Sequence, residues 1–141
     1  MTNLFRSRTT RLAILIGRLL LLYVVGVIVR QQYGIGVVVR NESGETLRQV
    51  SLKVESIGDR GKRYNLLDLT SGGHARVYAQ PVTESHINLE FMDVRSKLHT
   101  ETVVGYAEAG YCGNAKATIL PGDRVDAISD LVCWKSWLDF I

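Results

Sequence analysis

The three histidines are the side chains best suited to acid–base or metal chemistry in this chain of 141 residues. None of His74, His86 and His99 belongs to an HxH, HExxH or comparable metal-ligand spacing. His86 shares the stretch TESHINLEF with Glu84 and Glu90. Alternate residues of a strand face one side, and such a polar side is usually solvated. We therefore expect no catalytic residue, no metal ligand and no cofactor, and we predict that the chain is not an enzyme.

The two cysteines, Cys112 and Cys133, suggest a structural role instead. An even number of cysteines in a domain outside the cytoplasm indicates a disulfide. Closing a loop of this length would stabilise the fold by about 3 kcal/mol in the chain-entropy model. Two unpaired buried thiols are the alternative.

An apolar run over residues 12–29, LAILIGRLLLLYVVGVIV, is the strongest signal in the chain. Eighteen helical residues reach about 27 Å, close to the hydrocarbon thickness of a bilayer. Residues 1–11 carry three arginines and no acidic residue, and positive residues beside a membrane helix are retained in the cytoplasm. We predict a basic cytoplasmic segment (1–11), a transmembrane helix (12–29), a linker (30–34) and an extracytoplasmic remainder.

Arg18 is unusual because it lies inside this apolar run. Its long side chain can reach the headgroups, or it can pair with an acidic group in the membrane helix of a partner. Tyr23 lies on the same helix, so Arg18 and Tyr23 are candidate contacts with lipid or a partner protein. A cleavable signal peptide is the alternative, with an apolar core from Leu19 to Val29 and small residues at Gly34 and Gly36. It lacks an A-x-A site, so we favour a retained anchor.

The charge distribution argues against nucleic acid as a partner. The first thirty residues hold five arginines and no acidic residue, so the remaining chain has 12 basic and 14 acidic residues. These alternate in sign along the segments, whereas a nucleic-acid-binding domain gathers its positive charge on one face.

Alternation of apolar and polar residues begins at Ile35 and predicts strands. It is clear in IGVVVRN, LRQVSLKVE and HINLEFM, and shorter strands fit ARVYA, HTETVVGY, AKATIL and RVDAIS. Turn signals rich in Gly, Pro, Asn and Asp separate them. Seven or eight short strands predict an all-β domain over residues 35–133, an antiparallel β-sandwich of immunoglobulin-like type. Asn41-Glu42-Ser43 is either a glycosylation acceptor or a turn held by the Asn41 side chain.

The last eight residues, 134–141, break the strand pattern. Trp134, Trp137, Leu138 and Ile141 follow helical spacing, so we predict a short amphipathic tail. Its apolar face either packs on the sandwich or, through Trp134, Trp137 and Phe140, contacts the membrane interface or a partner.

Several segments together resemble a group of small bacterial envelope proteins. They are the basic N-terminus, the apolar helix, VVVRNESGETLRQVSLKV, DLTSGGHARV, ESHINLEF and GYAEAGYCGNAKATI. That group combines one membrane helix with an immunoglobulin-like or transthyretin-like sandwich. The resemblance implies a location in the bacterial envelope and no known activity. Combined with the topology predicted above, it gives a single-pass protein of the bacterial inner membrane, with a cytoplasmic N-terminus and a periplasmic or extracytoplasmic domain.

These observations favour an interaction module. Its helix binds the lipid bilayer, and its partner is a membrane protein. A small-ligand or polysaccharide-binding domain is the alternative, and it would need an exposed cluster of aromatic rings among Tyr64, Tyr78, Tyr106 and Tyr111. A secreted sandwich left after signal cleavage is a further alternative.

Overall fold

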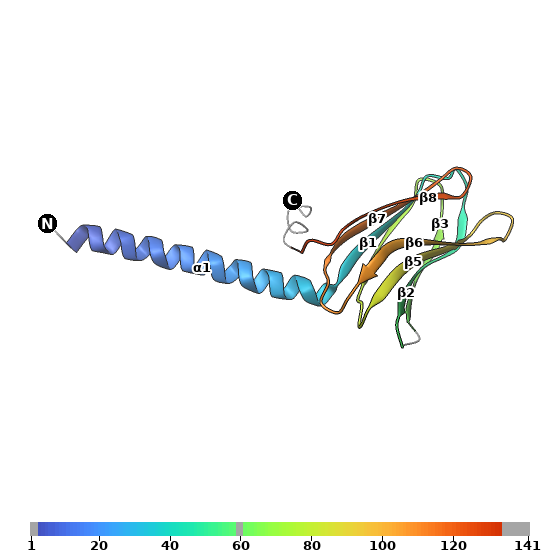
Figure 1. Cartoon of the computed structure of the whole chain (residues 1–141). Coiled ribbons are helices and arrows are strands. Elements are labelled where there is room, and N and C mark those ends of the chain that lie inside the picture. The colour runs from blue at the N-terminus through green and yellow to red at the C-terminus, as the bar shows by residue number, and fades with distance from the viewer. Residues whose placement is uncertain (1–2, 59–60, 134–141) are drawn as a thin grey trace.

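One long helix and eight strands form the structure, a computed structural model that describes residues 3–58 and 61–133 (Figure 1). The elements are α1 (Asn3–Tyr33), β1 (Ile35–Asn41), β2 (Leu47–Ser56), β3 (Lys62–Leu69), β4 (His74–Ala79), β5 (Ser85–Met92), β6 (Leu98–Ala107), β7 (Gly113–Leu120) and β8 (Arg124–Asp130).

The helix extends beyond the apolar run at both ends. It begins at Asn3 within the basic segment and ends at Tyr33. Residues 30–33, expected in a linker, are therefore its last turn, and only Gly34 separates the helix from β1. Gly34 has a φ of 74°, a left-handed conformation that commonly ends helices. In Figure 1 the helix projects away from the strands as a single rod.

The strands form two four-stranded sheets. The first sheet has the order β4-β1-β7-β8, and the second has the order β3-β2-β5-β6. All neighbours are antiparallel except β1 and β7, which are parallel, with Val37 opposite Ala115. The expectation of a purely antiparallel arrangement was therefore wrong at this pair. The long chain between β1 and β7 supplies the crossover that parallel neighbours need.

Strand alternation builds one core between the two sheets. Val37 and Val39 of the first sheet and Leu52, Leu89 and Phe91 of the second are buried in the same hydrophobic cluster. These are the apolar positions of the alternating pattern, so the periodicity correctly identified the inner faces of β1, β2 and β5.

The seven strands expected from alternation are all present, and β3 is an additional one. Its sequence, KRYNLLDL, does not alternate, and Leu67 within it is exposed with a φ of 64°. The pairing of β2 with β3 shifts register beside this residue. A strand with such an irregularity loses the period of two that sequence analysis relies on.

Strand direction divides the loops between two ends of the domain, here called the β-domain (residues 35–133). The helix-proximal end holds the loops at 80–84 and 108–112, residues 57–58 after β2 and residues 131–133 after β8. The helix-distal end holds the loops at 42–46, 70–73, 93–97 and 121–123. Figure 1 shows the β5–β6 and β7–β8 turns at the distal end, far from the helix.

Candidate functional site

The apolar helix is the largest exposed apolar surface in the described part of the chain. Thr10–Val29 is long and apolar enough to cross a membrane, and none of it is buried in the protein. A retained anchor and an export signal both need such a segment. An exposed apolar surface of this extent requires a cover of lipid or protein.

Arg18 and Tyr23, the two candidate contact residues of the helix, are both exposed. Arg18 lies eight residues after Thr10, which is about 12 Å along the helix. The midplane of a bilayer whose core is about 30 Å thick lies about 15 Å from its edge. If Thr10–Val29 spans the core, the Arg18 backbone is close to the midplane.

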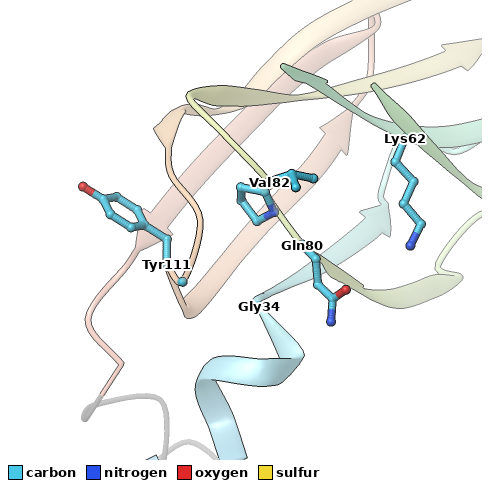
Figure 2. A pocket seen from close by; sticks show the side chains of 7 residues that line it. Gly34, Lys62, Gln80, Val82 and Tyr111 are labelled. Atoms are coloured by element: carbon cyan, nitrogen blue, oxygen red, sulfur yellow. The ribbon is translucent and has the colours of Figure 1, made fainter. Parts of the chain in front are cut away.

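The helix joins the β-domain tightly at Gly34. A Cβ atom built on Gly34 would lie 2.3 Å from the carbonyl oxygen of Ala79, so the helix end is pressed against the end of β4. A pocket of about 350 Å³ opens beside this joint, lined by Gly34, Lys62, Gln80, Pro81, Val82, Gly110 and Tyr111. Figure 2 shows Gln80 next to Gly34 and the Tyr111 hydroxyl pointing away from Val82.

The cysteines and two tyrosines gather at this same proximal end. Cys112 and Cys133 form a disulfide with their Cα atoms 5.0 Å apart, as predicted. The rings of Tyr106 and Tyr111 meet edge to face, with centroids 6.2 Å apart. The Tyr106 hydroxyl donates a hydrogen bond to Glu108, which raises the pKa of Tyr106 to about 12.

The four tyrosines considered for ligand binding do not share one exposed face. Tyr106 and Tyr111 form the pair just described, and Tyr64 and Tyr111 both pack against the hydrophobic core. The Tyr64 hydroxyl accepts a hydrogen bond from the backbone N–H of Gln80 at 3.2 Å. Tyr78 is half-buried on β4.

The outer face of the second sheet carries a row of charged groups. His86 Nε2 lies 2.7 Å from Glu55 Oε2, and the Lys53 ammonium contacts the same carboxylate. The hydrogen bond from Lys53 is the main reason that the pKa of the Glu55 carboxyl lies below its usual value, and the hydrogen bond with His86 lowers it further. Glu90, nearly buried, pairs with Arg63 at 2.6 Å. His86 is thus held by Glu55, which the sequence did not suggest, and not by Glu84 or Glu90.

A second titratable cluster lies at the helix-distal end and was missed by sequence analysis. His99 Nε2 is 3.2 Å from Asp93 Oδ2 and 3.7 Å from Asp123 Oδ2. Asp93 precedes β6, His99 is in β6, and Asp123 is in the β7–β8 turn. The Asp93 and His99 side chains are almost buried, and that of Asp123 is one-third exposed. The spacing of 6 and 24 residues matches no local motif, so only the fold brings these groups together.

Asp93 is rigidly oriented in this cluster. Its Oδ1 accepts hydrogen bonds from the backbone N–H groups of Arg95 and Lys97, both at 2.8 Å. The hydrogen bond from the Lys97 N–H is the main reason that the pKa of Asp93 lies below its usual value, and the hydrogen bond with His99 also lowers it. Burial acts in the opposite direction but does not cancel these effects. A cavity of about 260 Å³ reaches Asp93 and Asp123 from solvent.

Other predicted contact residues cannot be placed in this arrangement. Trp134, Trp137 and Phe140 lie outside the described residues.

Asn41 is fully buried, and its Nδ2 donates to the carbonyl oxygens of Glu45 and Leu69. Its Oδ1 accepts from the Ser43 N–H. Asn41 therefore acts as the turn-holding residue and not as a glycan acceptor.

Comparison with known proteins yields one structural similarity. No family model and no curated protein matches the chain. A protein from Eubacterium rectale, solved by NMR, aligns over 70% of this chain and 89% of its own, with 9% sequence identity and a TM-score of 0.43. A similarity at that level carries no argument about fold type or function.

Proposed function

We propose that this chain is a membrane-anchored, extracytoplasmic interaction module that serves as an accessory subunit of a larger membrane complex. In this proposal it is not an enzyme, and α1 remains attached, with its N-terminus in the cytoplasm of a bacterium. The β-domain then lies in the periplasm as a sandwich of immunoglobulin-like or transthyretin-like type. The disulfide is consistent with an oxidising compartment.

The observation that carries the proposal is the direct joint between an uncovered apolar helix and the β-domain. The helix continues only four residues, about 6 Å, beyond the apolar window that ends at Val29. The headgroup layer on each side of a bilayer is about 5 to 7 Å thick. A domain joined at Gly34 is therefore held at the membrane surface, with its helix-proximal loops facing the headgroups.

Arg18 supports a protein partner within the membrane. An arginine near the centre of a membrane helix costs about 2.5 to 3.5 kcal/mol on insertion scales. Thr10–Val29 has no acidic residue to offset this charge. An acidic side chain on a neighbouring membrane helix would do so, and such intramembrane pairs mark functional contacts. Lipid alone would have to accommodate Arg18 by local deformation or by extension of its side chain.

The test compares Arg18→Leu with Arg11→Leu in the full chain, purified from native membranes in mild detergent. Both variants remove one positive charge, but Arg11 lies at the edge of the apolar window and can reach the headgroups. We expect Arg18→Leu to lower the yield of a specific co-purifying membrane protein by about tenfold, corresponding to the loss of about 1.4 kcal/mol of pairing energy. Arg11→Leu should leave the yield unchanged.

Two controls separate loss of the partner from loss of the anchor. A phosphatase fused after Ile141 should remain active in both variants, and the intact mass of the purified chain should include residues 1–33. An identical set of co-purifying proteins in wild type and Arg18→Leu would contradict the intramembrane contact. A mature chain that begins after the helix would contradict the anchor itself.

A further inference from the structure

We propose that Asp93, His99 and Asp123 form a Zn²⁺ site that links the two sheets at the helix-distal end of the β-domain. This inference is independent of the proposed function, because the site lies at the opposite end from α1. It contradicts our expectation from the sequence that the chain has no metal ligand.

The ligand set is appropriate for zinc. One imidazole nitrogen and two carboxylate oxygens are available, and all three ligand atoms lie within 4.8 Å of one another. Zinc sites with three protein ligands of this kind complete a tetrahedron with water. Ca²⁺ instead takes six to eight oxygen ligands, and Mg²⁺ prefers a near-octahedral shell of oxygens. An imidazole nitrogen therefore favours Zn²⁺ over both ions.

The distances also suit a tetrahedral ion. Bonds of about 2.1 Å to Zn²⁺ place two ligand atoms of a tetrahedron about 3.4 Å apart. The measured separations from His99 Nε2, 3.2 Å to Asp93 Oδ2 and 3.7 Å to Asp123 Oδ2, lie on either side of this value. Small movements of the Asp123 side chain, which is one-third exposed, would be enough to close the site.

The supporting residues orient two of the three ligands before any ion binds. The His99 ring stacks on Phe91, with centroids 5.1 Å apart and an interplanar angle of 10°. The two backbone hydrogen bonds to Asp93 Oδ1 leave its Oδ2 facing His99. Groups that hold a ligand in position in this way strengthen metal binding.

Charge and access favour a cation at the same point. Two carboxylates meet His99 here, and Glu45 also lines the adjoining cavity. Arg95 is the basic residue that lines it. The cavity gives an ion and its remaining water ligand a route from solvent.

The site would connect parts of the chain that belong to different sheets. Asp93 and His99 come from the β5–β6 hairpin of the second sheet, whereas Asp123 comes from the β7–β8 turn of the first. Zinc bound here would close the open edge between β6 and β8, in the way that the disulfide closes the proximal end.

The test is Zn²⁺ titration of the full chain in detergent, prepared without a histidine tag and treated with a chelator. We expect one Zn²⁺ per chain, a higher unfolding temperature on binding, and visible absorption of tetrahedral type when Co²⁺ replaces Zn²⁺. Asp123→Asn should raise the dissociation constant by about tenfold or more, because even the loss of an outer-shell partner can cost that much.

The matched control is Asp126→Asn, which removes the same charge from an exposed position of β8. Asn tolerates the φ of 60° at position 123, so neither variant should disturb folding. Unchanged affinity in Asp126→Asn together with weak binding in Asp123→Asn would support the site. Absence of saturable binding, equal affinities in the two variants, or binding abolished by His86→Ala would overturn it.

Discussion

The two ends of the β-domain are closed by different kinds of interaction. At the helix-distal end, buried polar side chains hold the turns: Asn41 binds backbone groups of the β1–β2 loop and β3, and Asp93 binds those of the β5–β6 turn. At the helix-proximal end, a disulfide, a tyrosine pair and the Gly34 joint do so. The distal end thus depends on buried polar side chains. The proximal end adds a covalent bond and an aromatic pair to hydrogen bonds such as those of Ser85 with Ser56 and Thr83.

This difference suggests a division of roles. Buried hydrogen bonds define a unique geometry because an unsatisfied buried group is costly. The distal end can therefore hold three ligand atoms in a fixed arrangement, as the proposed zinc site requires. In the proposed function the proximal end carries the membrane-anchored helix, and a covalent link there tolerates local motion without loss of the connection.

Asn41→Ala should have the largest effect and tests the distal end. It leaves the carbonyl oxygens of Glu45 and Leu69 and the N–H of Ser43 without their partner. We expect a loss of about 3 to 4 kcal/mol in the free energy of unfolding, because the Asn41 side chain is fully buried. Urea denaturation of the full chain in detergent measures this loss.

Asn65→Ala serves as the control, because Asn65 is an exposed residue of β3 and should change stability by less than about 0.5 kcal/mol. Equal losses in the two variants would mean that the buried hydrogen bonds of Asn41 do not hold the distal end.

Removal of the disulfide tests how the proximal end is stabilised. Replacing Cys112 and Cys133 together by Ala removes a link across 21 residues, and the chain-entropy model gives a loss of about 3 kcal/mol. The measurement is the urea midpoint of wild type and double variant, each with and without reductant. Reductant should lower the midpoint of wild type alone. A midpoint that the double replacement does not change would show that packing is sufficient to close this end.

Most of the β-domain could be predicted from local sequence, and the reasons are visible at particular residues. Leu52 and Val54 alternate with Ser51, Lys53 and Glu55 because one face of the strand meets the core. Pro121-Gly122 and Ser71-Gly72-Gly73 mark turns because glycine adopts a positive φ at little cost. These signals are contained within a few consecutive residues.

What could not be predicted depends on contacts between distant segments. The parallel pairing of β1 with β7 joins Val37 to Ala115, and no local period encodes it. The Asp93, His99 and Asp123 cluster needs both sheets to be in register before the three side chains meet. β3 was missed for a different reason, since the irregularity at Leu67 removes the alternation itself. Periodicity therefore reports which side of a strand is buried, but not which strand lies beside it.

The smallest effect concerns the tyrosine pair at the proximal end. The neutral Tyr106 hydroxyl donates to the Glu108 carboxylate, and ionisation would place two negative charges side by side, so the pKa of Tyr106 is raised to about 12. A folded-state pKa above the unfolded value of about 10 means that this contribution to stability is complete below pH 10. It is then lost as the pH rises through about 12.

NMR of ring-labelled tyrosine in the full chain follows the titration of Tyr106 directly. Glu108→Gln should return the Tyr106 midpoint towards 10 while leaving the half-buried Tyr78 unchanged, because the carboxylate is the main cause of the shift. A Tyr106 midpoint near 10 in wild type would instead show that the contact between Tyr106 and Glu108 is absent in solution.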